Sequence, residues 1–86
     1  MENEIFEFAM VISVAPECDA EWERALRSAK TPAGMTMTVR NPELAMFTVA
    51  AAQEFLAIDK AMHFLEATAK TAGVRCALNA QPSHEV

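Results

Sequence analysis

Apolar and polar positions follow two different periods along this chain, and the period changes several times. Residues 4–15 are mostly Ile, Phe, Val, Met and Ala without Gly or Pro, which predicts a long strand. Residues 17–29 then take the i, i+3, i+4, i+7 spacing of an amphipathic helix. Its apolar positions are Trp22, Ala25, Leu26 and Ala29. We expect Asp19, or else Cys18, to cap this helix, because a carboxylate accepts hydrogen bonds from free N–H groups.

The second half of the chain repeats this order of elements. Residues 35–40 alternate strictly, and residues 44–51 form a second apolar run, so two paired strands are predicted around the turn signal at 41–42. A long helical pattern follows over residues 52–72, and residues 74–80 alternate again as a last strand. The resulting order is strand, helix, strand, strand, helix, strand.

Two similar halves, at about residues 4–40 and 43–80, each form one βαβ unit. The only two glycines of the chain, Gly34 and Gly73, fall at equivalent points of these halves. The simplest physical explanation is that each adopts the left-handed conformation that ends its helix.

This element order predicts an α+β ferredoxin-like split βαβ plait. Right-handed crossovers place both helices on one face of a four-stranded antiparallel sheet, in the order 4-1-3-2. A chain of 86 residues buries only about 60–65% of its unfolded surface, so a single core is expected. We therefore predict one domain over residues 1–80 and a flexible tail over residues 81–86.

The two strands expected at the centre of the sheet are apolar on both of their faces. Because the helices cover only one face, an apolar patch is expected on the other, and such patches usually mark interfaces. The pattern leaves open which set of the 44–51 strand lies on the uncovered face, the set with Leu44 and Met46 or the set with Phe47 and Val49. In either case we predict a homodimer or higher oligomer that packs sheet to sheet.

The second helix adds two large apolar residues to this predicted contact surface. A helical wheel puts Phe55, Ile58 and Leu65 on the core face and puts Leu56 and Phe64 roughly opposite. The outer pair either packs under a neighbouring loop or tail, or forms a second contact surface. The predicted apolar contact set is Ile5, Ala9, Val11, Phe47, Val49, Leu56 and Phe64.

Charge is distributed unevenly along the chain. The net charge is −5, which argues against direct binding to nucleic acid. Residues 1–23 contain seven acidic residues and no basic one. An acidic surface could dock on a basic protein, even on one whose usual ligand is nucleic acid. The predicted acidic contact residues are Glu17, Asp19, Glu21 and Glu23.

Reactive side chains are few. Asp59, His63 and Glu66 share one helical stripe that could hold a metal ion, but the spacing equally suits i, i+4 ion pairs on a solvated face, which we favour. Cys18 stands before a helix, yet four acidic neighbours oppose a thiolate there, and Cys76 alternates with apolar residues as a small core side chain. No nucleophile motif or phosphate loop is present. The sequence therefore predicts no catalytic, cofactor or metal site.

Together these features predict a non-enzymatic interaction or regulatory protein that self-associates and binds a protein partner, and in one variant of this hypothesis it inhibits a basic protein that handles nucleic acid. The alternative is a small-molecule or simple enzyme site enclosed between the sheets of a dimer. Its candidate polar groups are Glu7, Ser13, Arg40 and Arg75. The acidic N-terminus, two cysteines without a CxxC motif, and no apolar run near ~18 residues favour the reducing cytoplasm and no membrane contact.

Overall fold

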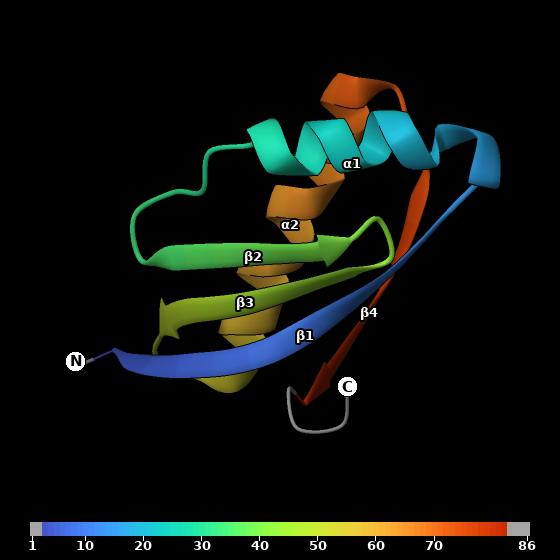
Figure 1. The fold of residues 1–86 in the computed structure, drawn as a ribbon. Coiled ribbons are helices and arrows are strands. Elements are labelled where there is room, and N and C mark those ends of the chain that lie inside the picture. The colour runs from blue at the N-terminus through green and yellow to red at the C-terminus, as the bar shows by residue number, and fades with distance from the viewer. Residues whose placement is uncertain (1–2, 83–86) are drawn as a thin grey trace.

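The computed structural model describes residues 3–82 and has the predicted order of elements (Figure 1). A short 3-10 turn, η1, precedes the first helix. The elements are β1 (Glu4–Val14), η1 (Pro16–Cys18), α1 (Asp19–Ser28), β2 (Met35–Asn41), β3 (Leu44–Ala51), α2 (Glu54–Ala72) and β4 (Cys76–Pro82). β4 ends two residues later than predicted, because Gln81 and Pro82 pair with β1. The rest of the predicted tail, residues 83–86, lies outside the described residues.

The four strands form one sheet in the order β2-β3-β1-β4, and all neighbouring strands are antiparallel. This arrangement confirms the predicted ferredoxin-like plait. β1 and β3 occupy the centre, so their backbone groups pair on both sides, whereas β2 and β4 form the edges. Both helices contribute buried residues to one core against the sheet, and they contact each other.

The core lies between the helices and one face of the sheet. In β1 and β3 the helix-facing side chains meet in register, with Phe8 opposite Phe47 and Met10 opposite Ala45. The rings of Phe8 and Phe47 stack with centroids 5.8 Å apart and an interplanar angle of 13°. From the helices, Trp22 completes this core at 0% exposure.

Helix α2 contacts the core through a stripe of small residues. Ala57, Ala61 and Ala69 are buried together with Leu65, and their small side chains let the helix lie close to the sheet. The prediction that Phe55 joins this face is wrong, because Phe55 is 65% exposed. At about 100° per residue it lies about 200° around the helix from Ala57.

The two glycines serve different purposes. Gly73 has φ +72° and ends α2, and the next residue, Val74, donates to the Ala69 carbonyl at 2.9 Å, as expected for a left-handed helix end. The equivalent prediction for Gly34 is wrong, since α1 already ends at Ala29 in an extended conformation. Gly34, with φ +82°, instead forms the turn before β2, which the Met35 N–H closes onto the Pro32 carbonyl at 3.2 Å.

The start of α1 also differs from prediction. Neither Cys18 nor Asp19 caps the helix through its side chain in the described structure. The backbone of η1 leads directly into α1 instead, and Cys18 already has αR dihedral angles. A side-chain cap needs an extended residue before the helix, so the 3-10 turn removes that geometry.

Candidate interaction surfaces

One face of the sheet is covered by neither helix, and we call it the open face. Because side chains alternate along strands, the register assigns its members directly. Among the described residues only one of them, Glu7, is charged. The open face consists of Ile5, Glu7, Ala9, Val11 and Ser13 from β1, Leu44, Met46, Thr48 and Ala50 from β3, Thr36 and Thr38 from β2, and Ala77, Asn79 and Gln81 from β4.

The centre of the open face is apolar. Ala9 lies opposite Met46, and Val11 lies opposite Leu44. Ala9 is completely buried among its neighbours, whereas the other three side chains are half-buried. Toward one end of β1, Ile5 is 64% exposed. The two pairs Ala9–Met46 and Val11–Leu44 therefore form an apolar strip across the two central strands, and Glu7 and Thr48 separate this strip from Ile5.

Of the five residues predicted for the open face, three lie there and two do not. Ile5, Ala9 and Val11 lie on the open face. Phe47 and Val49 do not: they are 2% and 1% exposed and belong to the core beneath the helices. The alternative left open by the pattern, Leu44 and Met46, takes their place. In a strand this choice is all or none, since a shift by one residue moves every side chain to the other face.

The threonines of the open face were not among the predicted contact residues. Thr36 and Thr38 extend the uncharged surface onto β2, and Thr48 extends it along β3. The signal that could have found them is the lack of charge at outward positions in strands that alternate cleanly. A solvated sheet face normally carries Lys and Glu at such positions.

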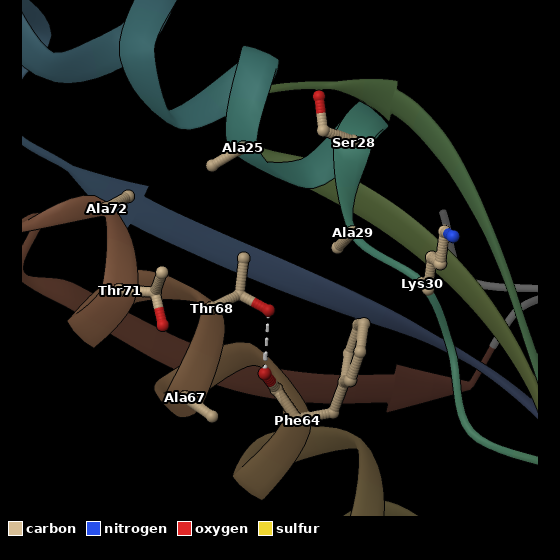
Figure 2. A pocket seen from close by; sticks show the side chains of 9 residues that line it. All are labelled: Ala25, Ser28, Ala29, Lys30, Phe64, Ala67, Thr68, Thr71 and Ala72. Carbon is tan, nitrogen blue, oxygen red and sulfur yellow. Dashed lines mark hydrogen bonds between the residues drawn. The ribbon is translucent and has the colours of Figure 1, made fainter.

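The two outer residues of α2 have different environments. Phe64 is half-buried and packs against the core cluster, and Figure 2 shows its ring directed from α2 toward the segment that follows α1. Packing under a neighbouring segment, one of the two predicted possibilities, thus accounts for Phe64. Leu56 remains 38% exposed, and a contact role for it stays a prediction.

Phe64 also borders a groove of about 420 Å³ between α1 and α2 (Figure 2). Most of its walls are small side chains, and Lys30 is its one ionisable lining residue. The Thr68 hydroxyl donates to the Phe64 carbonyl at 2.9 Å, so it is already bound within the helix. The groove is lined by Ala25, Ser28, Ala29, Lys30, Phe64, Ala67, Thr68, Thr71 and Ala72. These side chains could enclose part of a ligand, but they include few groups that could act in catalysis.

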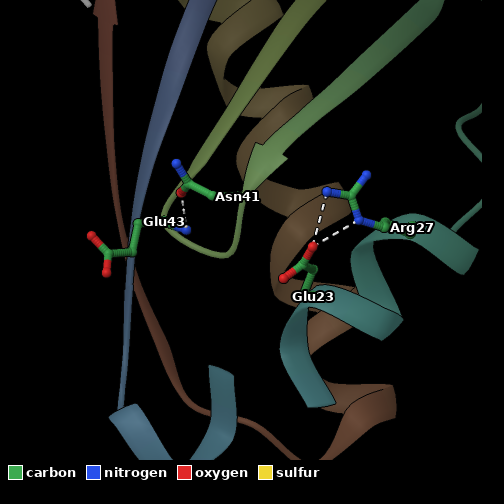
Figure 3. A network of polar contacts seen from close by, with 4 residues as sticks. All are labelled: Glu23, Arg27, Asn41 and Glu43. Atoms are coloured by element: carbon green, nitrogen blue, oxygen red, sulfur yellow. Dashed lines mark hydrogen bonds and ion pairs between the residues drawn. The ribbon is translucent and has the colours of Figure 1, made fainter. Parts of the chain in front are cut away.

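The predicted acidic residues gather in η1 and the first half of α1, and we call Glu17, Asp19, Glu21 and Glu23 the acidic cluster. Glu17 and Glu21 are exposed, whereas Asp19 and Glu23 are half-buried. Glu23 accepts from Arg27 at 2.9 Å, one turn further along the helix (Figure 3). Negative charge at a helix N-terminus also stabilises the helix itself.

Glu4 and Glu7 do not join this cluster. Glu4 and Glu7 lie at the far end of β1, and a strand of 11 residues is about 35 Å long. The uneven charge of the sequence therefore corresponds to two separate places, each with two exposed carboxylates among residues 3–82. Figure 1 shows the two ends of β1 on opposite sides of the molecule.

The candidate metal stripe carries an exposed contact between Asp59 and His63. Asp59 and His63 lie 3.4 Å apart, and both side chains are more than half exposed. Within residues 3–82 no three ligating side chains come together as a metal would require. The interpretation as i, i+4 pairing on a helix surface fits this geometry.

Both cysteines are half-buried and free in the described structure. Burial, followed by the nearby charge of Glu66, raises the pKa of Cys76 above its ordinary value. A raised pKa keeps this thiol protonated at neutral pH, which suits a small side chain that packs beside the core.

The polar groups of the predicted enclosed site are not brought together. Glu7 and Ser13 both lie on the open face, but six residues of strand separate them by about 20 Å. Arg40 lies at a register shift at the end of β2, and Arg75 precedes β4. Within one chain these four residues form no common site.

Comparison with known proteins gives no further guide, because no family model, curated protein or solved structure matches the chain. Among the described residues, neither helix is long and apolar enough to cross a membrane.

Proposed function

We propose that this protein is a non-enzymatic interaction protein that pairs with a second copy through the open face and presents the acidic cluster to a basic protein. One observation carries the proposal: among the residues that the strand register places on the open face, Glu7 is the only charged one, and Arg40 lies at the register shift at the end of β2.

The composition of the open face is that of an interface. Depletion of charge and enrichment in Met and large apolar residues distinguish the centres of protein interfaces from the rest of the surface. Met46, Leu44 and Val11 occupy that centre, and uncharged threonines surround them on β2 and β3. Burying this strip would stabilise the complex by about 25 cal/mol for each Å² of apolar surface removed from water.

A second copy is the occupant that best fits this face. Two sheets pack face to face about 10 Å apart when their twists match, and identical sheets have identical twists. A two-fold dimer brings each apolar strip onto its own copy, so apolar area meets apolar area. Any small ligand of the alternative function would then lie between the same two sheets.

Met46→Lys tests the dimer, because it puts a charge at the centre of the open face without removing a core side chain. We expect the wild-type chain at micromolar concentration to have twice the mass of one chain in light scattering, and the variant to be monomeric. The control is Ala67→Lys on the exposed side of α2, which should leave the dimer intact. A monomeric wild type, or equal dissociation of both variants, contradicts the proposed dimer.

The acidic cluster supplies the second half of the proposal. Glu17 and Glu21 are exposed and enter no ion pair among residues 3–82, so their charge is available to a partner. Complementary charge speeds association and selects partners more than it adds affinity. A basic surface, including one that normally binds nucleic acid, is the matching chemistry.

Reversing these two charges tests the cluster. We expect Glu17→Lys with Glu21→Lys to weaken binding to a lysine- and arginine-rich peptide about tenfold at low salt. The control, Glu54→Lys with Glu66→Lys, makes the same change in net charge at exposed sites of α2. Equal weakening by both pairs, measured by calorimetry, would show that net charge alone attracts the peptide and would reject a localised docking site.

A further inference from the structure

The outer edge of β2 has unpaired backbone groups. β2 is the last strand of the sheet on its side, and the Ala50 N–H donates to the Gly34 carbonyl at 2.8 Å. In an antiparallel ladder, inward and outward backbone groups alternate from this pair onward. Thr36 and Thr38 therefore point their N–H and C=O groups toward β3, and the residues between them point outward.

Three residues present these outward groups. Met37 and Val39 each expose an N–H and a carbonyl, and Met35 exposes its carbonyl, because its N–H already donates to Pro32. Over residues 35–39 the strand reads Met-Thr-Met-Thr-Val, without Lys, Pro or a bulge. Lys, Pro and bulges usually stop an edge strand from pairing with another chain, and residues 35–39 have none of them. The register shift of β2 comes only after Val39.

A groove of about 400 Å³ runs beside this edge. Helix α1 and the segment after it form one wall, and the edge of β2 forms the other. The lining residues are Leu26, Arg27, Ala29, Thr31, Met37, Thr38 and Val39. An additional strand at the edge of β2 would direct alternate side chains into this groove, next to Leu26.

We propose that β2 pairs antiparallel with β2 of a second copy, with the two-fold axis at Met37. In this register Met37 lies opposite Met37 of the second copy, Met35 lies opposite its Val39, and Thr36 lies opposite its Thr38. The N–H groups of Met37 and Val39 donate across the seam to the carbonyls of Met37 and Met35, and the result is a continuous eight-stranded sheet.

The self-complementarity of the strand selects a second copy as the occupant. Methionine and valine side chains meet on the groove side, where Met37 and Val39 are half-buried and Met35 is buried, and threonines meet on the other side. Both kinds of cross-strand pair are favourable. No charged residue lies within residues 35–39, so no like charges oppose each other.

This edge interface uses backbone groups that the open face does not. It goes beyond the proposed function, and the two interfaces can form independently of each other. Two different two-fold interfaces on one chain give a tetramer when their axes cross at right angles, and other arrangements of the axes give larger assemblies. The test is therefore made in the Met46→Lys variant, in which pairing through the open face is expected to be absent.

Amide hydrogen exchange followed by NMR reports on the edge residue by residue. We expect the exchange of the Met37 and Val39 amides to slow at least tenfold as the protein concentration rises from micromolar to millimolar. Thr36 and Thr38 are internal controls, because their amides donate to β3 at every concentration. Exchange at Met37 and Val39 that does not depend on concentration overturns the proposal.

A cross-link tests the register. In a Cys18→Ser/Cys76→Ala background, Met37→Cys should form a disulfide with itself across the axis, where paired Cα atoms are about 5.5 Å apart. The matched control is Val39→Cys, whose copies would be about 13 Å apart along the two strands, beyond the reach of a disulfide. Equal cross-linking of both variants, or none of Met37→Cys, overturns the proposed register.

Discussion

Replacing Trp22 with alanine is expected to lower the free energy of unfolding by about 3–5 kcal/mol. Trp22 is the largest fully buried side chain of the protein and the main contribution of α1 to the core. Its loss leaves a cavity between α1, α2 and the sheet that the small neighbouring alanines cannot fill. For a domain of this size such a loss is a large part of the total stability.

Trp22→Phe separates the contribution of the apolar volume of this side chain from that of its indole N–H group. The indole Nε1 is buried and has no hydrogen-bond partner among residues 3–82. Phenylalanine keeps most of the apolar volume and removes that unsatisfied donor, whose burial costs about 1–3 kcal/mol. We therefore expect Trp22→Phe to lose much less stability than Trp22→Ala.

Urea unfolding followed by far-UV circular dichroism measures both variants. Tryptophan fluorescence is unsuitable, since Trp22 is the only tryptophan of the chain. A loss of less than about 1 kcal/mol for Trp22→Ala, or a phenylalanine variant as unstable as the alanine variant, would contradict this account of the core.

The second large effect is expected at the contact between α2 and the sheet. Ala61 is completely buried in the middle of α2, where a small side chain sets the distance between helix and strands. Ala61→Leu adds three carbon atoms to this contact and should cost about 1–3 kcal/mol through overpacking. Both residues favour helices, so helix propensity contributes almost nothing to the difference.

Ala67→Leu is the matched control for Ala61→Leu. It makes the same substitution in the same helix at an exposed position, and we expect a change within about 0.5 kcal/mol. Thermal and urea unfolding of the two variants give the comparison. Similar losses at both positions would mean that Ala61 does not set the spacing between helix and sheet.

The fold could be predicted almost completely from local patterns. The apolar residues repeat every two positions in the strands and every 3.6 in the helices, and the changes between these periods located six elements. Because βαβ crossovers are right-handed, only one order of the four strands fitted these elements. The errors concern positions whose environment depends on distant residues. Phe55 lies at the border of the apolar side of the helical wheel, and the stripe of α2 that is buried against the sheet, from Ala57 to Ala69, is rotated away from it.

The candidate surfaces were predicted less well than the fold. An apolar open face is expected from two strands that are apolar on both sides, and the register places Ile5, Ala9 and Val11 on that face. The sequence could not predict whether Phe47 or Met46 lies on the open face, because both alternating sets of side chains in that strand contain large apolar residues. The stacking of Phe47 on Phe8 beneath the helices decides it.

The sequence by itself determined the element order, the plait topology and the uneven distribution of acidic residues, since each depends on residues that are neighbours along the chain. The tertiary structure was needed to show which strand faces are covered, that Gly34 serves a turn and not a helix end, and that Glu4 and Glu7 lie far along β1 from the acidic cluster. These properties depend on how strands pair and where helices cross them. Such contacts join residues far apart in sequence, so the local pattern of apolar and polar residues does not predict them.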